Sequence, residues 1–570
     1  MLATANTLHQ ADWIVLVGYF VVMLGIGAYF YRYMRGMKDY FSGGNRVPWW
    51  LAAGSFYMSG FSVFAFVTYS AIAYTDGLAG VSIMWSYIPG TLLCALVFAP
   101  RWRRARVDSP VEYLEARYSR TLRQVCAWQG VPLKIIDDAL KIVAIGMFIS
   151  ASLGLEMRSC MLVSGIIMLA YTFLGGLWAV IVTDFIQFVV MGAAVLVLLI
   201  LALTKVGGIG GLIEGSPPGF FRPVTDDYNA MYFVAWPLLL AVSMCSVHWQ
   251  IIQRFYCVPD EREARKMGFL VTGLYVVTPL IMFVPAMAAR QFLPPETAPR
   301  EVYAVLCRTL LQPGLLGLMI AAMFAATMSM LSSDYNAAAA VVTNDVYRRL
   351  LRPQAEQKEL VFVGRAATLL VGGSSLALAM ALAGTTAKDL FDNMVKLFSV
   401  ATAPVAVPMI LGLLIRRLTG TSALAGFVGG LTVTLTLFLH LKEPVSVLGT
   451  QIKPENVIFF SGLAATSLIM FGVSAIWPRA SAEAARVRPF LQRLDLPIGS
   501  LPQDQPAGEA AVSPFRVVGI SMAAIGAIML AVTPFVHRST DIGLNGGMGL
   551  ALLVVGGLMA WKSRKGKGRL

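Results

Sequence analysis

Three serines and an aspartate lie close together in one apolar segment. Ser329, Ser332 and Ser333 are spaced i, i+3 and i+4, so their hydroxyls share one face of a helix. A single serine in a membrane helix commonly bonds back to a carbonyl of the preceding turn. Three on one face, followed by Asp334, bring several oxygens to one place. Oxygen is the ligand that hard cations require, so this run is a candidate site for a cation such as sodium.

A second acidic residue, Asp184, lies near the start of another apolar segment. A carboxylate at membrane depth is costly unless it is paired, so it is a functional candidate by default. A helix cap at the membrane interface is the alternative, since an acid favours a helix N-terminus. Other charged residues have i, i+3 or i, i+4 spacing, which predicts pairing within a helix near the interface. These are Lys134, Asp137, Asp138 and Lys141 in one segment, and Asp389, Asp392 and Lys396 in another.

The segment 49–74 carries small and polar residues where a lipid-facing helix would carry Leu and Ile. These residues are Gly54, Ser55, Ser59, Gly60 and Ser62. An unwound stretch here would free backbone carbonyls to hold an ion or a solute. Close packing of helices through small residues explains the same pattern, and the sequence alone does not decide between the two.

The composition requires that most of the chain be surrounded by lipid. Of 570 residues, 57% are hydrophobic and 13% are charged, whereas soluble domains carry about 25% charged residues. A bilayer-spanning helix needs about 20 apolar residues, and the chain has about fifteen such segments. They are 12–31, 49–74, 79–100, 128–152, 157–176, 178–203, 231–252, 267–289, 303–333, 360–383, 389–415, 422–441, 455–477, 514–536 and 545–561. The predicted fold is an all-α polytopic membrane protein.

The distribution of basic residues predicts the orientation of the chain. The net charge is +14, but the basic residues gather in alternate loops, which is the positive-inside pattern and not a nucleic-acid-binding surface. The basic loops are 32–46, 101–123, 254–266, 348–365, 416–417, 479–493 and 562–569. We therefore expect a multi-pass protein of the cell membrane with its N-terminus outside and its C-terminus in the cytoplasm.

Other functional classes find little support. The four histidines form no HExxH motif and no P-loop occurs, which argues against a membrane enzyme. The six cysteines show no CxxC spacing, so they are interpreted as packing residues and not as a metal site. No organic cofactor is predicted. The sequence does not predict an oligomeric state.

Four motifs carry a resemblance to a known family. They are FSGGNRVPWW at 41–50, SPVEYLEARY at 109–118, GGLWAVIVTDFIQ at 175–187, and the serine-rich run that closes with NDVY at 344–347. With these motifs the chain resembles the sodium/solute symporter family of the solute carrier family 5 type. The resemblance implies a LeuT-type five-plus-five inverted repeat and symport of a small organic solute with sodium by alternating access. The implied divisions are 1–35 for an extra N-terminal helix, 49–204 and 231–416 for the two repeats, 420–477 for additional core helices, 478–513 for a cytoplasmic linker, and 514–570 for a C-terminal helix pair and basic tail.

The resemblance also implies two sodium sites. The family's usual site maps to the carbonyls of Met58, Phe61 and Ala326 and to hydroxyls at positions 329 and 330. Here the second hydroxyl position is Met330, and a thioether is a poor ligand for sodium. A second site of some family members maps to Asp184, Ser329, Ser332 and Ser333, all of which are present. We therefore expect cation coupling to run mainly through the second site.

The solute is less well specified. The resemblance and the sequence together give candidate pocket residues, which are Gly60, Phe64, Trp85, Tyr87, His248 and Gln250. They are mostly apolar or aromatic, and buried sugar hydroxyls would lack partners among them. This favours a small organic anion or a partly apolar solute over a sugar. The alternatives are proton-coupled or uncoupled transport by the same fold and, further from the observations, a transporter-like membrane sensor.

Overall fold

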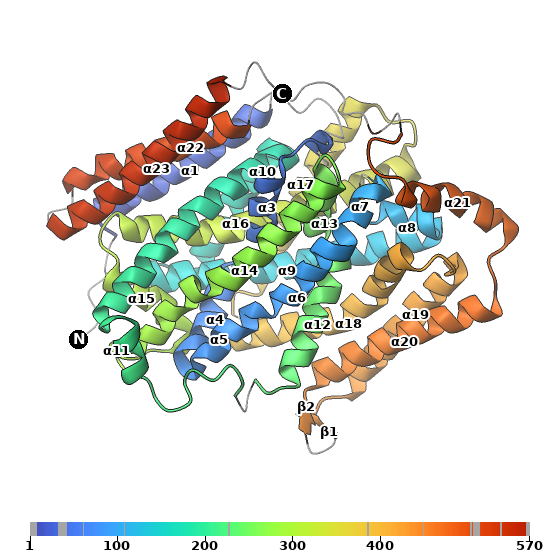
Figure 1. Ribbon diagram of the computed structural model, residues 1–570, viewed down its shortest axis with the longest axis horizontal. Coiled ribbons are helices and arrows are strands. Elements are labelled where there is room, and N and C mark those ends of the chain that lie inside the picture. Colours follow the sequence, from blue (N-terminus) through green and yellow to red (C-terminus); the bar gives the residue numbers. More distant parts are fainter. Residues whose placement is uncertain are drawn as a thin grey trace.

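The protein was analysed as a computed structural model, which describes residues 8–31, 43–60, 62–107, 109–225, 228–384, 387–447, 450–501, 504, 514–535 and 539–565. This part of the chain is almost wholly helical, and its long helices run along a common direction (Figure 1). Eleven helices of the described ranges are long and apolar enough to cross a membrane, and two bent pairs bring the number to thirteen. The all-α polytopic fold is confirmed.

The first part of the bundle holds the first broken helix. Its elements are α1 (Gln10–Tyr31), η1 (Gly43–Asn45), α3 (Trp49–Met58), α4 (Val63–Asp76), α5 (Leu78–Trp85), α6 (Tyr87–Leu93), η2 (Cys94–Phe98), α7 (Ala99–Ala105), α8 (Glu112–Arg117), α9 (Arg120–Leu153) and α10 (Met157–Lys205). The axes of α3 and α4 differ by 62°. Ser62 begins α4 by accepting a hydrogen bond from the Phe64 backbone N–H at 3.3 Å. The predicted segment 49–74 is therefore broken at its small and polar residues.

The second part repeats this design. Its elements are α11 (Gly208–Glu214), α12 (Tyr232–Ser246), α13 (Trp249–Cys257), α14 (Glu261–Ala289), η3 (Pro299–Glu301), α15 (Val302–Leu310), α16 (Leu315–Val341), η4 (Val342–Leu351), α17 (Gln357–Ala381) and α18 (Ala387–Leu414). The axes of α12 and α13 differ by 53°. Two broken helices thus lie in corresponding places of the chain.

The remaining elements lie at the edges of the bundle. They are α19 (Gly420–His440), β1 (Val445–Val447), β2 (Thr450–Ile452), α20 (Pro454–Ile476), α21 (Ser481–Asp495), α22 (Pro514–Val532), η6 (Thr533–Phe535) and α23 (Ser539–Lys565). The antiparallel strands β1 and β2 pair Val445 with Ile452 and join α19 to α20. Figure 1 shows the red pair α22 and α23 beside α1, at one side of the molecule.

The prediction of a single helix over 303–333 was wrong. The segment 303–333 is two helices, α15 and α16, because Pro313 and Gly314 end the first and Gly314 has a positive φ of 90°. Asp12 of α1 then satisfies the start of α16, since its Oδ1 accepts hydrogen bonds from the Gly314 and Gly317 N–H groups at 2.7 Å each. The predicted segments 157–176 and 178–203 both lie within α10. They are not one straight helix, because the Tyr171 and Thr183 hydroxyls contact each other although 12 residues of straight helix would span about 18 Å.

Close helix packing also occurs on the broken segment. The helix α10 packs against α1, α3 and α16. A methyl group at Gly54 would stand 2.6 Å from the Phe185 ring, so α3 and α10 approach each other through this glycine. The two explanations of the small residues in 49–74 therefore apply to different positions: Gly54 allows packing, and the break lies between Met58 and Val63.

Candidate cation and solute sites

The carboxylate of Asp184 lies where α3, α10, α13 and α16 meet, and it is fully buried. Its Oδ2 accepts hydrogen bonds from the Ser55 hydroxyl and from Arg254 Nη2, the latter at 3.2 Å. Arg254 has no exposed surface. This pair of opposite charges therefore balances itself inside the bundle.

Arg254 also reaches the serine run. Its Nη2 donates to Ser333 Oγ at 2.6 Å and its Nε donates to Ser55 Oγ at 3.0 Å. Ser333 Oγ lies 3.0 Å from Ser59 Oγ, next to the break of the first broken helix. A guanidinium group from α13 thus joins α3, α10 and α16 at the predicted second cation site.

Sequence reasoning assigned Arg254 to the start of a cytoplasmic loop, and this was wrong. The predicted helix ends at 252, whereas α13 continues to Cys257. The helix has no exposed residue beyond the break, since all of Trp249–Cys257 is buried. One feature of the sequence could have indicated that the helix continues. Gln250 lies four residues before Arg254, so a continuing helix would place both polar side chains on one face.

The other predicted ligands of the second site differ in their bonding. Ser332 Oγ donates to the carbonyl of Ser329 at 3.2 Å, which is the bond within the helix expected of a single serine. The Ser329 hydroxyl lies near Asp184, yet neither Ser329 Oγ nor Asp184 Oδ1 has a partner of hydrogen-bonding geometry among the described residues. Two buried oxygens, from α16 and α10, therefore lie close together with coordination capacity left over.

The usual site is only partly described. Met58 and Ala326 are fully buried at the end of α3 and within α16. Phe61 lies outside the described residues. Thr327 Oγ1 accepts a hydrogen bond from the Val63 N–H at 3.2 Å, which ties the start of α4 to α16. The side chain of Met330 lines the central cavity.

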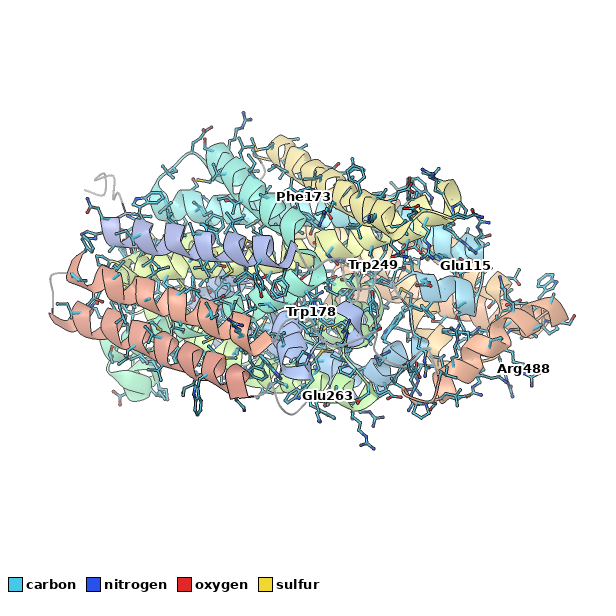
Figure 2. All side chains as sticks on the ribbon, turned by 90° about the horizontal axis from the view of Figure 1, so that it is seen from above. Glu115, Phe173, Trp178, Trp249, Glu263 and Arg488 are labelled. Atoms are coloured by element: carbon cyan, nitrogen blue, oxygen red, sulfur yellow. The ribbon has the colours of Figure 1, made fainter. Side chains whose placement is uncertain are left out.

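That cavity lies between the two broken helices, has a volume of about 90 Å³ and is partly open to its surroundings. Of the predicted pocket residues, Gly60, Phe64, Tyr87 and His248 line it. Trp85 does not, because its indole N–H donates to the Val276 carbonyl on α14 at 3.0 Å. Gln250 does not either, because its side chain accepts from Lys134 at 3.2 Å. Trp249, the first residue of α13, lies among the packed helices in the middle of the molecule (Figure 2).

The charged residues of α9 pair within the helix, as their spacing predicts, and they also pair with a second helix. They are buried, and Lys141 Nζ bonds to Asp137 at 2.8 Å and to Asp138 at 3.0 Å within the helix. The same ammonium also contacts Asp334 of α16 at 2.6 Å. Lys134 contacts the other oxygen of Asp334 at 2.7 Å. The sequence could not reveal these partners, since they are about 200 residues apart. The side chains of Asp389 and Asp392 lie outside the described part.

Comparison with known proteins assigns the architecture. A model of the sodium:solute symporter family matches residues 40–430, more than half of the chain. The chain belongs to the sodium:solute symporter family. It is accordingly a multi-pass membrane protein and a secondary active transporter, which couples symport of a solute to sodium by alternating access. This confirms the resemblance found in the motifs.

Individual relatives are distant. The sodium/glucose cotransporter 2 of Rattus norvegicus is 28% identical over 479 residues, covering 75% of this chain and 71% of its own. The sodium/sialic acid symporter NanT of Aliivibrio fischeri is 25% identical, covering 76% and 88%. The structure of a Na+-coupled sialic acid symporter, solved in a substrate-bound outward-open state, covers 82% of this chain and 98% of its own with a TM-score of 0.73 at 22% identity. This last similarity shows the LeuT-type fold.

Proposed function

We propose that the coupling sodium ion binds at Asp184, Ser329, Ser332 and Ser333, and that it competes there with Arg254. The observation that carries this proposal is the unequal use of the site's oxygens. Asp184 Oδ2 and Ser333 Oγ are bonded to Arg254, while Asp184 Oδ1 and Ser329 Oγ have no partner among the described residues. Asp184 Oδ1 and Ser329 Oγ can therefore coordinate sodium before Arg254 leaves the site.

Competition would connect ion binding to movement. A sodium ion at Asp184 would stand beside a buried guanidinium, and like charges at such distances repel strongly where the dielectric constant is low. Arg254 would therefore leave Asp184 when sodium binds. Arg254 belongs to α13, the second half of the second broken helix, whereas Asp184 belongs to the first repeat. Replacement of Arg254 by sodium at Asp184 would therefore shift one repeat against the other. The repeats proposed for this motion are 49–204 and 231–416.

The solute is proposed to be a small organic molecule that binds in the central cavity. Sugars and sialic acid, which the named relatives transport, are the first neutral and anionic solutes to test. The chain is proposed to lie in the cell membrane with its N-terminus outside and its C-terminus in the cytoplasm. The usual sodium site is expected to contribute less, since Met330 supplies no oxygen there.

The test is sodium-dependent uptake into proteoliposomes at fixed pH, with potassium as the replacement cation. Ser329→Ala should raise the sodium concentration for half-maximal uptake by about tenfold, since a ligand oxygen is lost without leaving another group unpaired. Ser164→Ala is the matched control outside the site and should leave the sodium dependence unchanged, because its buried hydroxyl donates to the Cys160 carbonyl within its own helix.

Two results would overturn the proposal. Equal sodium dependence of both variants and the unaltered protein would place the ion elsewhere. Uptake that is independent of sodium but driven by a proton gradient would favour the proton-coupled alternative.

A further inference from the structure

One wall of the central cavity carries buried charge that the sodium site does not use. Asp137 and Lys141, both on α9, line the cavity with side chains 7% and 5% exposed. Behind them lie Asp138 and Asp334, each fully buried, and Lys134. Distances of 2.6 to 3.0 Å join these five residues through the two lysines. They are called the α9 charge cluster below.

The α9 charge cluster has one more carboxyl group than it has ammonium groups. It contains two lysines and three aspartates, and none of its contacts within the described residues involves a further cation. Asp334 is balanced, since each of its oxygens meets an ammonium group. Asp138 Oδ2 is buried with no hydrogen-bond partner in the described chain. A third carboxyl group buried beside two ammonium groups must hold a proton or meet a further cation, so the cluster can accept a cation in place of that proton.

The cavity gives access to the cluster only at Asp137 and Lys141. The ammonium of Lys141 is already surrounded by three carboxylates, at 2.8, 3.0 and 2.6 Å. An anionic solute would gain little from it and would meet the carboxyl groups that surround it. A cationic solute would instead find Asp137, which shares a single ammonium with two other carboxylates.

The rest of the cavity wall suits an organic cation. It is aromatic over much of its extent, with Phe64, Tyr69, Tyr87, Trp236 and Phe398. Aromatic faces attract ammonium groups, most strongly where water is excluded, and such cages recognise quaternary ammonium ligands. The Trp236 Nε1 and His248 Nδ1 atoms have no hydrogen-bond partner in the described ranges, and both residues line the cavity. They could bond an oxygen at the other end of the solute.

We propose that the solute is a small organic ammonium compound that also carries an oxygen-bearing group. Its ammonium group binds at Asp137 among the aromatic side chains. The inference rests on the proposed function, since it names the solute class for that transport cycle. It replaces the organic anion favoured by the sequence, because the sequence did not show that Asp137 lines the solute cavity.

Choline and its uncharged carbon isostere, dimethylbutanol, test the proposal. The detergent-purified full chain is titrated with each while its melting temperature is followed, so that binding is measured without transport. Choline should raise the melting temperature and dimethylbutanol should not, since only choline carries charge. Equal stabilisation by the two, or stabilisation by sialic acid or glucose but not by choline, would overturn the proposal.

Variants then locate the binding. Asp137→Asn should weaken choline binding by about tenfold or more. Asp138→Asn removes the same charge from the cluster but no group that lines the cavity, so it should still distinguish choline from dimethylbutanol. Trp236→Leu should weaken choline binding, while the same change at Trp477, which is 64% exposed, should not. If Asp137→Asn does not fold, two measurements still test the proposal: choline binding by Trp236→Leu against Trp477→Leu, and choline against dimethylbutanol in the unaltered protein. Equal choline affinity in all variants would overturn the proposal.

The two proposals fail separately. If choline binds and Asp137→Asn weakens it but no sodium gradient drives uptake, sodium coupling fails and the solute class is supported. If sodium drives uptake of a sugar and choline does not bind, the solute class fails and coupling is supported.

Discussion

Arg254 is the residue on which the proposed exchange depends. Its guanidinium contacts Asp184, Ser55 and Ser333 with no exposed surface. Such a buried pair contributes little net stability, because the cost of removing both charges from water offsets their attraction. Breaking it by removing one partner is different, since the other charge is left buried and unbalanced. This asymmetry makes Arg254 a sensitive position for testing the exchange.

Arg254→Gln should make folding depend on sodium. Without sodium, the free energy of unfolding should fall by roughly 3–5 kcal/mol, because Asp184 is left buried without a cation. Sodium should restore much of this loss and should bind more tightly than in the unaltered protein, since its competitor is gone. Thermal unfolding of the purified protein across sodium concentrations measures both effects. Arg262→Gln, an exposed position at the start of α14, should change neither; a variant that sodium does not rescue would contradict the exchange.

At the scale of elements, the contact between α3 and α10 sets the geometry of the Asp184 site. Gly54 on α3 faces Phe185, the neighbour of Asp184 on α10. The Phe185 ring is held between Trp50 and Phe188, with ring centroids 4.9 and 6.2 Å away. The ring therefore has little room to move aside. Any bulk at Gly54 would separate Ser55 from the carboxylate that it hydrogen-bonds.

Gly54→Ala should destabilise the protein despite the better helix propensity of alanine. The propensity gain is about 1 kcal/mol, whereas overpacking of a tight interface costs typically 1–3 kcal/mol. Gly192→Ala on α10 is the matched control, because nothing lies within 4 Å of a methyl group there, and it should be neutral or stabilising. Chemical unfolding of the purified variants gives both values. Equal gains at the two positions would show that α3 and α10 do not pack through Gly54.

At the scale of the whole molecule, the arrangement separates a central bundle from peripheral pairs. The two broken helices lie within the bundle, whereas α22 and α23 pack mainly against each other and against α1 (Figure 1). Asp12 joins α1 to the N-terminus of α16. The serine run of the site therefore lies on a helix whose start is held by the peripheral helix α1.

The proposed orientation can be tested with single cysteines, because all six native thiols are buried. Glu296→Cys and Ser481→Cys both place a thiol at an exposed position, the first in a loop predicted outside and the second in the linker predicted inside. A membrane-impermeant maleimide should label Glu296→Cys in intact cells and Ser481→Cys only after permeabilisation. The reverse pattern would invert the orientation.

The sequence by itself determined the membrane class, the helical segments and the residues near the cation site. These follow from local properties, namely apolar length, basic loops and the spacing of Ser329, Ser332 and Ser333 along one helix. It failed at the boundaries of 303–333 and 231–252, where a glycine turn and a continuing helix were not visible in hydropathy. Only the tertiary structure showed that Arg254 meets Asp184 and that Asp334 meets Lys134 and Lys141. These charges come from helices 70 to 200 residues apart, and electrostatic balance depends on distance in space, which a sequence does not contain.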